Sequence, residues 1–209
     1  SVRLGPPLAR PSKIVCVGAN YADHAKEFGH DVPAEPILLS KATTALNGPH
    51  DPIHLPEGAQ VVDAEAELAV VMGRTAARVR QADAMNFVAG YTVLNDVTER
   101  VVQKANGQWF RGKGFDTFCP LGPFLATSDE VPNPEGMRVW QSLNGETLQD
   151  GNTADFLFGI PFLIEYISHG MTLLPGDVIA TGTPPGIGSA RDPQVLLKVE
   201  GTDTALGVP

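Results

Sequence analysis

Residues 61–72, VVDAEAELAVVM, constrain the fold more than any other segment of the chain. Polar and apolar residues alternate in the first half of the segment, as in a β-strand with one face in a polar environment. The second half is a continuous apolar run, which is typical of a strand buried on both faces. We therefore expect a strand that leads from a polar cavity into a hydrophobic core, with Glu65 and Glu67 at the border between the two.

The rest of the chain is rich in turns, with 22 glycines and 18 prolines among 209 residues. This composition argues against a helical bundle and favours strands with interspersed helices. The predicted fold class is mainly β, or α+β, with residues 1–12 as an N-terminal tail and residues 13–209 as one domain. We expect strands at 13–18, 88–94, 118–127, 177–180 and 195–200, extended or edge-strand segments at 37–41 and 51–56, a hairpin over 137–148 about Asn144-Gly145, and helices at 21–28, 76–87, 97–104 and 155–169.

Size and charge limit the classes of partner. A chain of this length buries roughly 70% of its unfolded surface, so an enclosed site is possible. The net charge of −9 repels a phosphate backbone, so no nucleic-acid partner is expected. The longest apolar stretch, residues 156–164, is shorter than the roughly 18 residues that a membrane helix needs. We therefore expect no membrane partner.

The cysteines and the N-terminus favour a cytoplasmic location. Cys16 and Cys119 lie in or beside apolar stretches and form no C-x-x-C pair, so we expect buried, reduced thiols rather than a disulfide framework. No basic segment followed by an apolar one opens the chain, and we expect no targeting signal.

Three acidic residues are candidate metal ligands. Glu65 and Glu67 are two apart on the predicted strand, which places both carboxylates on one face with Cβ atoms roughly 7 Å apart. Asp96 follows a second apolar strand, and sheet pairing could bring it to the same place. Three converging carboxylates need a cation, and oxygen ligands select Mg²⁺, Mn²⁺ or Ca²⁺. The alternative is a solvated strand face, which is the usual setting of an isolated E-x-E.

Two further groups carry possible chemistry. His24 and Glu27 are three apart on a predicted helix, so the carboxylate could orient the imidazole, although a chance pair on an exposed helix is the commoner case. Lys113 lies between two glycines, and the alternative is an ordinary surface lysine. Residues 179–188, IATGTPPGIG, could form a backbone nest for an anion with Thr181 and Thr183 as extra donors, or could be a tight turn without a ligand.

Seven segments taken together resemble the fumarylacetoacetate hydrolase superfamily, and the resemblance covers about residues 13–188. The resemblance implies a mixed β-sandwich or β-roll fold, commonly a homodimer, with one Mg²⁺ or Mn²⁺ per chain held by Glu65, Glu67 and Asp96. The segments, in chain order, are VGANYADHAKE, EPILLSK, DAEAELAVVMG, AGYTVLNDVTER, RGKGFDTFCPLGP, LNGETLQDGNTADFLFGIPFLIEYIS and LLPGDVIATGTPPGIG.

The resemblance also implies an activity. Members of this superfamily act on 2-oxo acids: they hydrolyse carbon-carbon bonds in acylpyruvates and related diketo acids, or they decarboxylate or isomerise close relatives. By this resemblance His24 and Glu27 form an acid-base pair on a lid and Lys113 is catalytic. The implied substrate contacts are Arg100, Gln103, Thr183, Gly182 and Tyr21.

A metal-dependent hydrolase of a diketo acid is the first hypothesis, and a 2-oxo acid decarboxylase or isomerase is the second. A binding module without turnover is a third, but it would not need an acid-base pair. The sequence departs from the family pattern at three places: Ala19 stands where acylpyruvases often have Arg, Gly114 where Ser is usual, and a short segment after Gly188 where a longer loop is usual.

Overall fold

The computed structural model describes residues 3–27, 29, 31–105, 107–199 and 204–207. A mixed seven-stranded sheet forms its centre, in the order β2-β1-β11-β5-β6-β8-β3. The strands β1 and β11 run parallel, as do β3 and β8, and the other neighbours are antiparallel. These strands are β1 (Ile14–Gly18), β2 (Ile37–Lys41), β3 (Leu46–Asn47), β5 (Ala66–Met72), β6 (Val88–Asn95), β8 (Cys119–Thr127) and β11 (Val178–Ala180).

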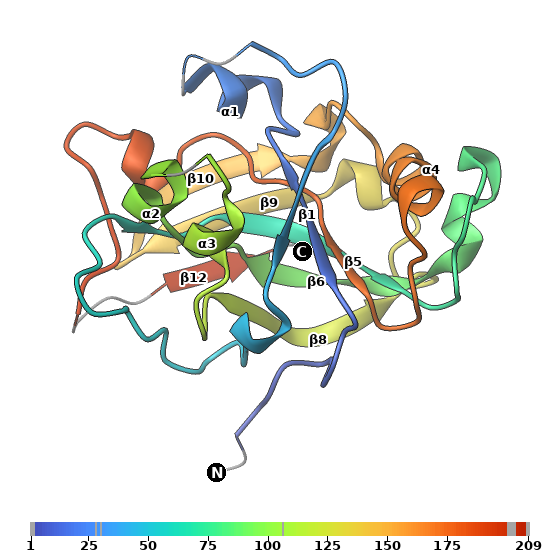
Figure 1. The fold of residues 1–209 in the computed structure, drawn as a ribbon, viewed down its shortest axis with the longest axis horizontal. Coiled ribbons are helices and arrows are strands. Elements are labelled where there is room, and N and C mark those ends of the chain that lie inside the picture. The colour runs from blue at the N-terminus through green and yellow to red at the C-terminus, as the bar shows by residue number, and fades with distance from the viewer. Residues whose placement is uncertain (1–2, 28, 30, 106, 200–203, 208–209) are drawn as a thin grey trace.

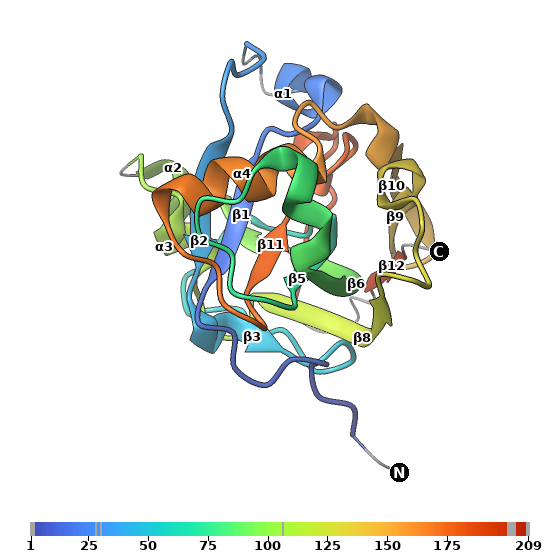
Figure 2. The same ribbon diagram turned by 90° about the vertical axis from the view of Figure 1, so that its right-hand side faces the viewer.

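Two smaller sheets complete the β structure. A three-stranded sheet has the order β10-β9-β12 and lies across the molecule from β1 and β2, as Figure 2 shows. Its strands are β9 (Arg138–Leu143), β10 (Glu146–Asn152) and β12 (Thr204–Gly207). The third sheet pairs β4 (Val62–Asp63) with β7 (Thr98–Glu99). The expectation of a mainly β or α+β fold is confirmed.

Helices are short and lie outside the central sheet (Figure 1). The longest, α4, begins after Gly159 and has Pro161 in its first turn, where the missing N–H of proline leaves no hydrogen bond unmade. The α-helices are α1 (Ala22–Glu27), α2 (Arg100–Ala105), α3 (Phe110–Lys113) and α4 (Ile160–Gly170), and the 3₁₀ turns are η1 (Thr43–Ala45), η2 (Gln81–Phe87), η3 (Pro134–Gly136), η4 (Thr153–Asp155) and η5 (Gly188–Ala190). Within the described residues, no helix is both long and apolar enough to cross a membrane.

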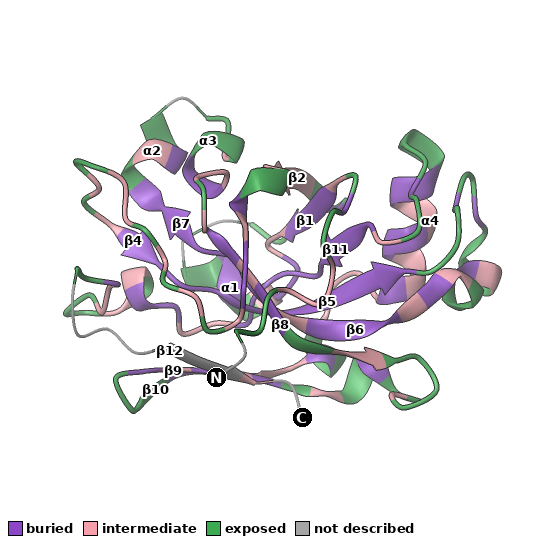
Figure 3. Ribbon diagram, turned by 90° about the horizontal axis from the view of Figure 1, so that it is seen from below, coloured by how far each residue is buried: buried purple, intermediate pink, exposed green. Residues whose placement is uncertain are grey.

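The central strand β5 separates two halves of the core and is buried along its whole length (Figure 3). Leu68 and Val70 on one face pack with α4, whereas Ala69 on the other face packs with β1 and β8. Cys16 and Cys119 lie in this second half, and burial raises the pKa of both thiols. The expectation of buried thiols is confirmed.

The hairpin predicted about Asn144-Gly145 is present. Strands β9 and β10 pair antiparallel, with Leu143 opposite Glu146. Both turn residues have positive φ, 51° and 82°, which is the backbone of a type I′ turn and explains the Asn-Gly pair.

Several segments differ from the sequence prediction. Residues 61–72 are not one strand, because the chain leaves β4 before residue 64 and enters β5 at Ala66. Residues 97–104 begin with β7 and become helical only at Arg100. Residues 195–199 are not a strand, and Glu200 lies outside the described residues; the last strand is β12.

The helix predicted over residues 76–87 is also wrong. Ala76 exchanges backbone hydrogen bonds with Leu173, and Arg78 donates its N–H to the carbonyl of Ser168 with a positive φ of 53°. These bonds to the end of α4 replace the bonds that a helix would make within itself. Only Gln81–Phe87 turns, as the 3₁₀ segment η2.

Candidate metal and substrate site

Three buried carboxylates converge where β5 begins and β6 ends. The two strands are antiparallel neighbours with Glu67 opposite Leu94, so Asp96, just after β6, lies beside Glu65, just before β5. Asp96 donates its N–H to the carbonyl of Glu65 at 2.9 Å. One oxygen from each of Glu65, Glu67 and Asp96 lies within 4.8 Å of the others, so the cluster can hold a metal ion. The predicted convergence is present, although Glu65 precedes the strand instead of lying on it.

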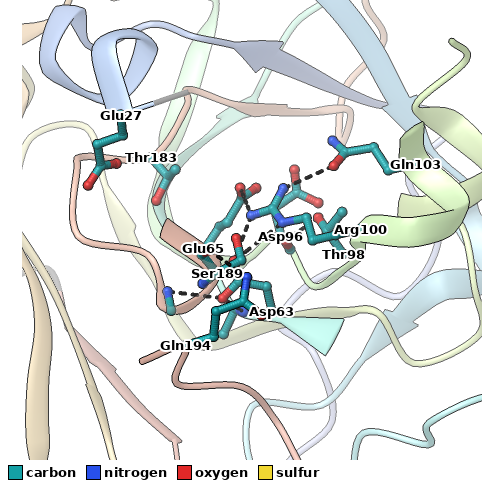
Figure 4. Close-up of polar contacts among 12 residues, drawn as sticks. Glu27, Asp63, Glu65, Asp96, Thr98, Arg100, Gln103, Thr183, Ser189 and Gln194 are labelled. Atoms are coloured by element: carbon teal, nitrogen blue, oxygen red, sulfur yellow. Dashed lines mark hydrogen bonds and ion pairs between the residues drawn. The ribbon is translucent and has the colours of Figure 1, made fainter. Parts of the chain in front are cut away.

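Three buried cations surround this cluster. Lys113 Nζ donates to Glu65 Oε2 at 2.8 Å and to Asp96 Oδ2 at 2.5 Å. Lys41 Nζ donates to the other oxygen of Asp96 at 2.5 Å. Arg100 reaches from α2 to Glu65 and to a fourth carboxylate, Asp63, as Figure 4 shows. Lys113 is therefore not a surface lysine.

The charges shift the pKa values of Glu65 and Glu67 in opposite directions. Burial raises the pKa of the Glu65 carboxyl, but Arg100 and Lys113 outweigh burial, and the pKa falls well below its usual range. Burial, then Asp96 and Glu65, raise the pKa of Glu67 far above its usual value. Glu67 is thus the group whose ionisation the site opposes most, and a metal ion would relieve that opposition.

The buried acidic and basic groups of the site do not balance in charge when all of them are ionised. Taken as ionised, Asp63, Glu65, Glu67 and Asp96 carry four negative charges, and Lys41, Arg100 and Lys113 carry three positive ones. This cluster of seven described residues is left with one negative charge. A divalent cation would change it to one positive charge, which a monoanionic ligand would neutralise.

Backbone N–H groups of residues 182–189 hold two carboxylates of the site, Glu67 and Asp63, in place. Gly182 donates to Glu67 Oε2 at 2.8 Å with a φ of 96°, and a Cβ at this position would lie 2.8 Å from Cβ of Asn20. Gly188 and Ser189 both donate to Asp63 at 3.1 Å. The nest predicted in this loop therefore binds carboxylates of the protein itself.

The two threonines of the loop also bond to the protein. Thr181 Oγ1 donates to the carbonyl of Leu68, and Thr183 Oγ1 donates to the carbonyl of Ala66 at 2.8 Å. Thr183 also accepts from Gln149 Nε2 at 2.7 Å. These bonds fix the loop to β5, and Thr183 still lines the cavity described below.

Helix α1 lies over the site and carries the predicted pair. His24 Nδ1 lies 3.1 Å from Glu27 Oε2, and the other oxygen of Glu27 accepts the N–H of Gly186 at 2.7 Å. His24 is only 9% exposed, so the alternative of a chance pair on an exposed helix does not hold for it. Glu27 therefore joins α1 and the imidazole to the glycine-rich loop of residues 182–189.

A cavity of about 130 Å³ connects these groups. Its polar lining includes the three carboxylates, His24, Lys113, Arg100 and Gln103, and its apolar lining includes Ala19, Leu39 and Trp109. The full lining is Val17, Gly18, Ala19, His24, Ala25, Leu39, Glu65, Glu67, Asp96, Arg100, Gln103, Lys104, Trp109, Lys113 and Thr183.

Two of the predicted substrate contacts are not among the lining residues. Tyr21 packs its ring against Phe156 at 5.1 Å, and its hydroxyl has no hydrogen-bond partner among the described residues. Burial, then Glu67, raises the pKa of Tyr21. Gly182 acts through its N–H on Glu67. Both roles in substrate binding stay predictions.

The three departures from the family pattern have structural counterparts. Ala19 has a φ of 54° and lines the cavity. A methyl group therefore takes the position at which acylpyruvases often have the positive charge of an Arg. Gly114 donates to the carbonyl of Phe110 and ends α3, and a Cβ there would lie 2.9 Å from that oxygen. After Gly188 the chain forms η5 and then bonds to β4 through Leu197.

Sequence reasoning missed Lys41 and Asp63. Lys41 is at the end of β2, far from Asp96 in sequence, and only the fold shows that its side chain is completely buried there. Asp63 stands two residues before Glu65, so the same alternation that indicated Glu65 and Glu67 could have included it.

The comparisons with known proteins extend over nearly all of this chain. A family model described as "Fumarylacetoacetate (FAA) hydrolase C-terminal" matches residues 13–203. The mitochondrial oxaloacetate tautomerase FAHD2A of Homo sapiens is 50% identical over 194 residues, which are 92% of this chain and 62% of that protein.

Two solved structures are similar in fold and sequence. The 5-carboxymethyl-2-hydroxymuconate delta-isomerase from Mycobacterium smegmatis is 43% identical with a TM-score of 0.86, and the match covers 99% of this chain and 77% of that one. The fumarylacetoacetate hydrolase from Exiguobacterium antarcticum is 40% identical with a TM-score of 0.91, and the match covers 100% of this chain and 75% of that one.

The buried pair of Lys41 and Asp96 yields a prediction for stability. Lys41→Met leaves Asp96 Oδ1 and the carbonyl of Val97 without their donor, so the free energy of unfolding should fall by about 3–5 kcal/mol in urea denaturation with EDTA present. The control is Lys26→Met, which removes an exposed ion pair with Asp23 and should change stability little. Equal losses in the two variants would contradict the role of Lys41.

Proposed function

The chain belongs to the fumarylacetoacetate hydrolase family, and on that premise we propose that it is a divalent-cation-dependent enzyme of short 2-oxo acids. One observation carries the proposal: His24, whose imidazole is held by Glu27, lines the same small cavity as the three clustered carboxylates. A cation site and an acid-base group in one cavity are what enolisation of a 2-oxo acid requires.

The donor set fits Mg²⁺ or Mn²⁺. Carboxylate oxygens are ligands that both ions prefer, and the cluster offers no sulfur or imidazole ligand among its three members. We propose one ion per chain, held by Glu65, Glu67 and Asp96. When bound, the ion supplies positive charge that stabilises negative charge on the oxygens of a 2-oxo acid.

His24 is the residue we assign to proton transfer. Its Nδ1 is held by Glu27, so Nε2 is the nitrogen that takes or gives a proton at the substrate. Glu27 is itself held by the N–H of Gly186, which keeps the imidazole over the cavity. Lys113, fixed by Glu65 and Asp96, places a positive charge beside the enolate oxygen.

Keto–enol tautomerisation of an oxaloacetate-like acid is the reaction that this arrangement supports best. It needs one proton removed from carbon and one delivered to oxygen, and His24 can serve as the base and the acid in turn. The likeness to a human oxaloacetate tautomerase and to a delta-isomerase supports this choice, because both names describe isomerisation without cleavage of a carbon-carbon bond.

Hydrolysis of a carbon-carbon bond in a diketo acid is the second candidate, and the likeness to the Exiguobacterium antarcticum hydrolase supports it. In that reaction His24 takes a proton from water, the water oxygen adds to the distal carbonyl, and the carbon-carbon bond breaks. Its electron pair passes to the enolate, which then takes a proton at carbon. Decarboxylation of a 2-oxo acid would use the same enolate.

The acid-base role predicts a rate effect. With Mg²⁺ or Mn²⁺ present, the protein should accelerate enol–keto interconversion of oxaloacetate, followed by ultraviolet absorbance, or cleavage of acetylpyruvate. His24→Asn should lower kcat by about 10²- to 10⁴-fold and change KM little, since the imidazole acts on the proton transfer. His169→Asn, at the exposed end of α4, is the control and should keep full activity.

The outcomes separate the candidates. Turnover of oxaloacetate alone supports tautomerisation, and cleavage of acetylpyruvate supports hydrolysis. Inactivity on both substrates with both metals would overturn the proposed function. A His24→Asn variant with unchanged kcat would overturn the role of the imidazole.

The raised pKa of Glu67 predicts that metal reverses the order of stability of the wild type and the Glu67→Gln variant. In EDTA, Glu67→Gln should be at least as stable as the wild type, because it removes one of three repelling carboxylates and keeps an acceptor for Gly182. With Mg²⁺ or Mn²⁺ at a hundred times its Kd, the wild type should gain about 2.7 kcal/mol and the variant should gain far less.

Thermal unfolding with and without metal measures this difference. The control is Glu57→Gln, which changes an exposed acidic residue outside the carboxylate cluster. This variant should gain as much stability from metal as the wild type does. Equal stabilisation of Glu67→Gln and the wild type by metal would contradict the assignment of Glu67 as a ligand.

A further inference from the structure

We propose that Trp109 limits the length of substrate that the site accepts, so that short 2-oxo acids fit and acids with long distal chains do not. The inference rests on the proposed function and adds the substrate size class and the residue that sets it. It makes Trp109 a specificity-determining residue, with no part in proton transfer.

Trp109 stands between two hollows. The site cavity of about 130 Å³ lies on one side, and an outer groove of about 620 Å³ lies on the other. Among the described residues, two line both hollows, Trp109 and Leu39. The remaining groove residues lie in or next to β1, β2, the end of α4 and the start of α3, and none of them belongs to the carboxylate cluster. The indole and the leucine are therefore the wall that closes the site on this side.

The indole lies where it does because residue 18 is a glycine. A Cβ on Gly18 would be 2.7 Å from Cζ3 and 3.5 Å from Cη2 of Trp109, and 3.4 Å from Cδ2 of Leu39. The ring thus packs directly on the backbone at the end of β1. The backbone at the end of β1, a side chain from the middle of β2 and the indole before α3 meet here, so the wall is a packed contact and leaves little room for a substrate group to pass.

The position of Trp109 is tied to the charged part of the site. Its carbonyl accepts the N–H groups of Gly112 at 3.0 Å and Lys113 at 3.2 Å, which form the turn of α3. The same short helix therefore carries the wall at one end and the Lys113 ammonium at the other. The distance between the charged end of the cavity and its apolar wall is fixed by one helical turn.

The chemistry of the lining orients a substrate between these ends. A 2-oxo carboxylate is drawn to the side with Arg100, Lys113 and the proposed cation. In this proposal its distal chain lies against the apolar lining residues Ala19, Leu39 and Trp109, the last two of which also line the groove. A chain that is too long meets the indole, whereas without the indole the cavity would open into the larger groove.

Binding of straight-chain 2-oxo acids tests the limit without requiring turnover. Calorimetry on the Mn²⁺-loaded protein would compare 2-oxobutanoate with 2-oxooctanoate in the wild type, Trp109→Ala and Phe110→Ala. Phe110 is the matched control, because it is 50% exposed and lines only the groove. If Trp109→Ala fails to fold, Trp109→Phe replaces it, and the smaller ring should relax the limit partly.

We expect the wild type to bind the short acid at least about tenfold more tightly than the long one, as methylene groups without space are rejected to this degree. Trp109→Ala should remove that difference, and Phe110→Ala should keep it. Failure to bind any acid of the series, equal wild-type binding of short and long acids, an unchanged ratio in Trp109→Ala or Trp109→Phe, or the same relaxation in Phe110→Ala would overturn the proposal.

The two proposals can fail separately. If the wild type shows the length limit in binding but turns over neither oxaloacetate nor acetylpyruvate, the proposed function fails and the role of Trp109 stands. If the wild type is active on short substrates and the Trp109 variants keep the wild-type ratio, the role of Trp109 fails and the proposed function stands.

Discussion

Mutual repulsion of three buried carboxylates is the constraint on which the rest of the site depends. One oxygen from each of Glu65, Glu67 and Asp96 lies within 4.8 Å of the others, and each residue is almost fully buried. The fold offsets this repulsion with Lys41, Arg100 and Lys113, and with backbone donors such as Gly182. These partners come from β2, α2, α3 and the loop after β11, so the cluster determines how segments distant in sequence must meet. With all four carboxylates of the site ionised, one negative charge remains, so a bound cation would favour the ionised form of Glu67 that the protein alone opposes.

The same charges reconcile an acidic protein with an anionic substrate. The net charge of −9 disfavours anions in general, yet the local set of buried groups becomes positive once a divalent cation is added. The helix α1 covers this spot with His24, and Glu27 fastens it to the glycine-rich loop through Gly186. Charge, acid-base group and cover are thereby brought together by short local elements on a rigid sheet.

Sequence reasoning predicted the convergence of the carboxylates better than it predicted the secondary structure. The alternation that ends in an apolar run placed Glu65 and Glu67 beside a buried strand, where a carboxylate requires compensation, and the strand end before Asp96 gave the third carboxylate of the observed cluster. The partners of these groups could not be found in this way, since the pairing of Lys41 with Asp96 arises only when β2 and β6 take their places in the folded sheet. The helix predicted at residues 76–87 failed for a related reason, because tertiary bonds to the end of α4 outweigh local helical preference. Tyr21, indicated by the family resemblance, lies against Phe156 in the core.

The central claim is that Glu65, Glu67 and Asp96 together bind one divalent cation. The most direct test is a crystal structure of the protein grown with Mn²⁺, with anomalous diffraction used to locate the ion. The account predicts one anomalous peak per chain, bonded to a carboxylate oxygen of each of the three residues. An Mn²⁺ ion bound elsewhere while this cluster stays empty, with the Lys113 ammonium still joined to Glu65 and Asp96, would contradict it.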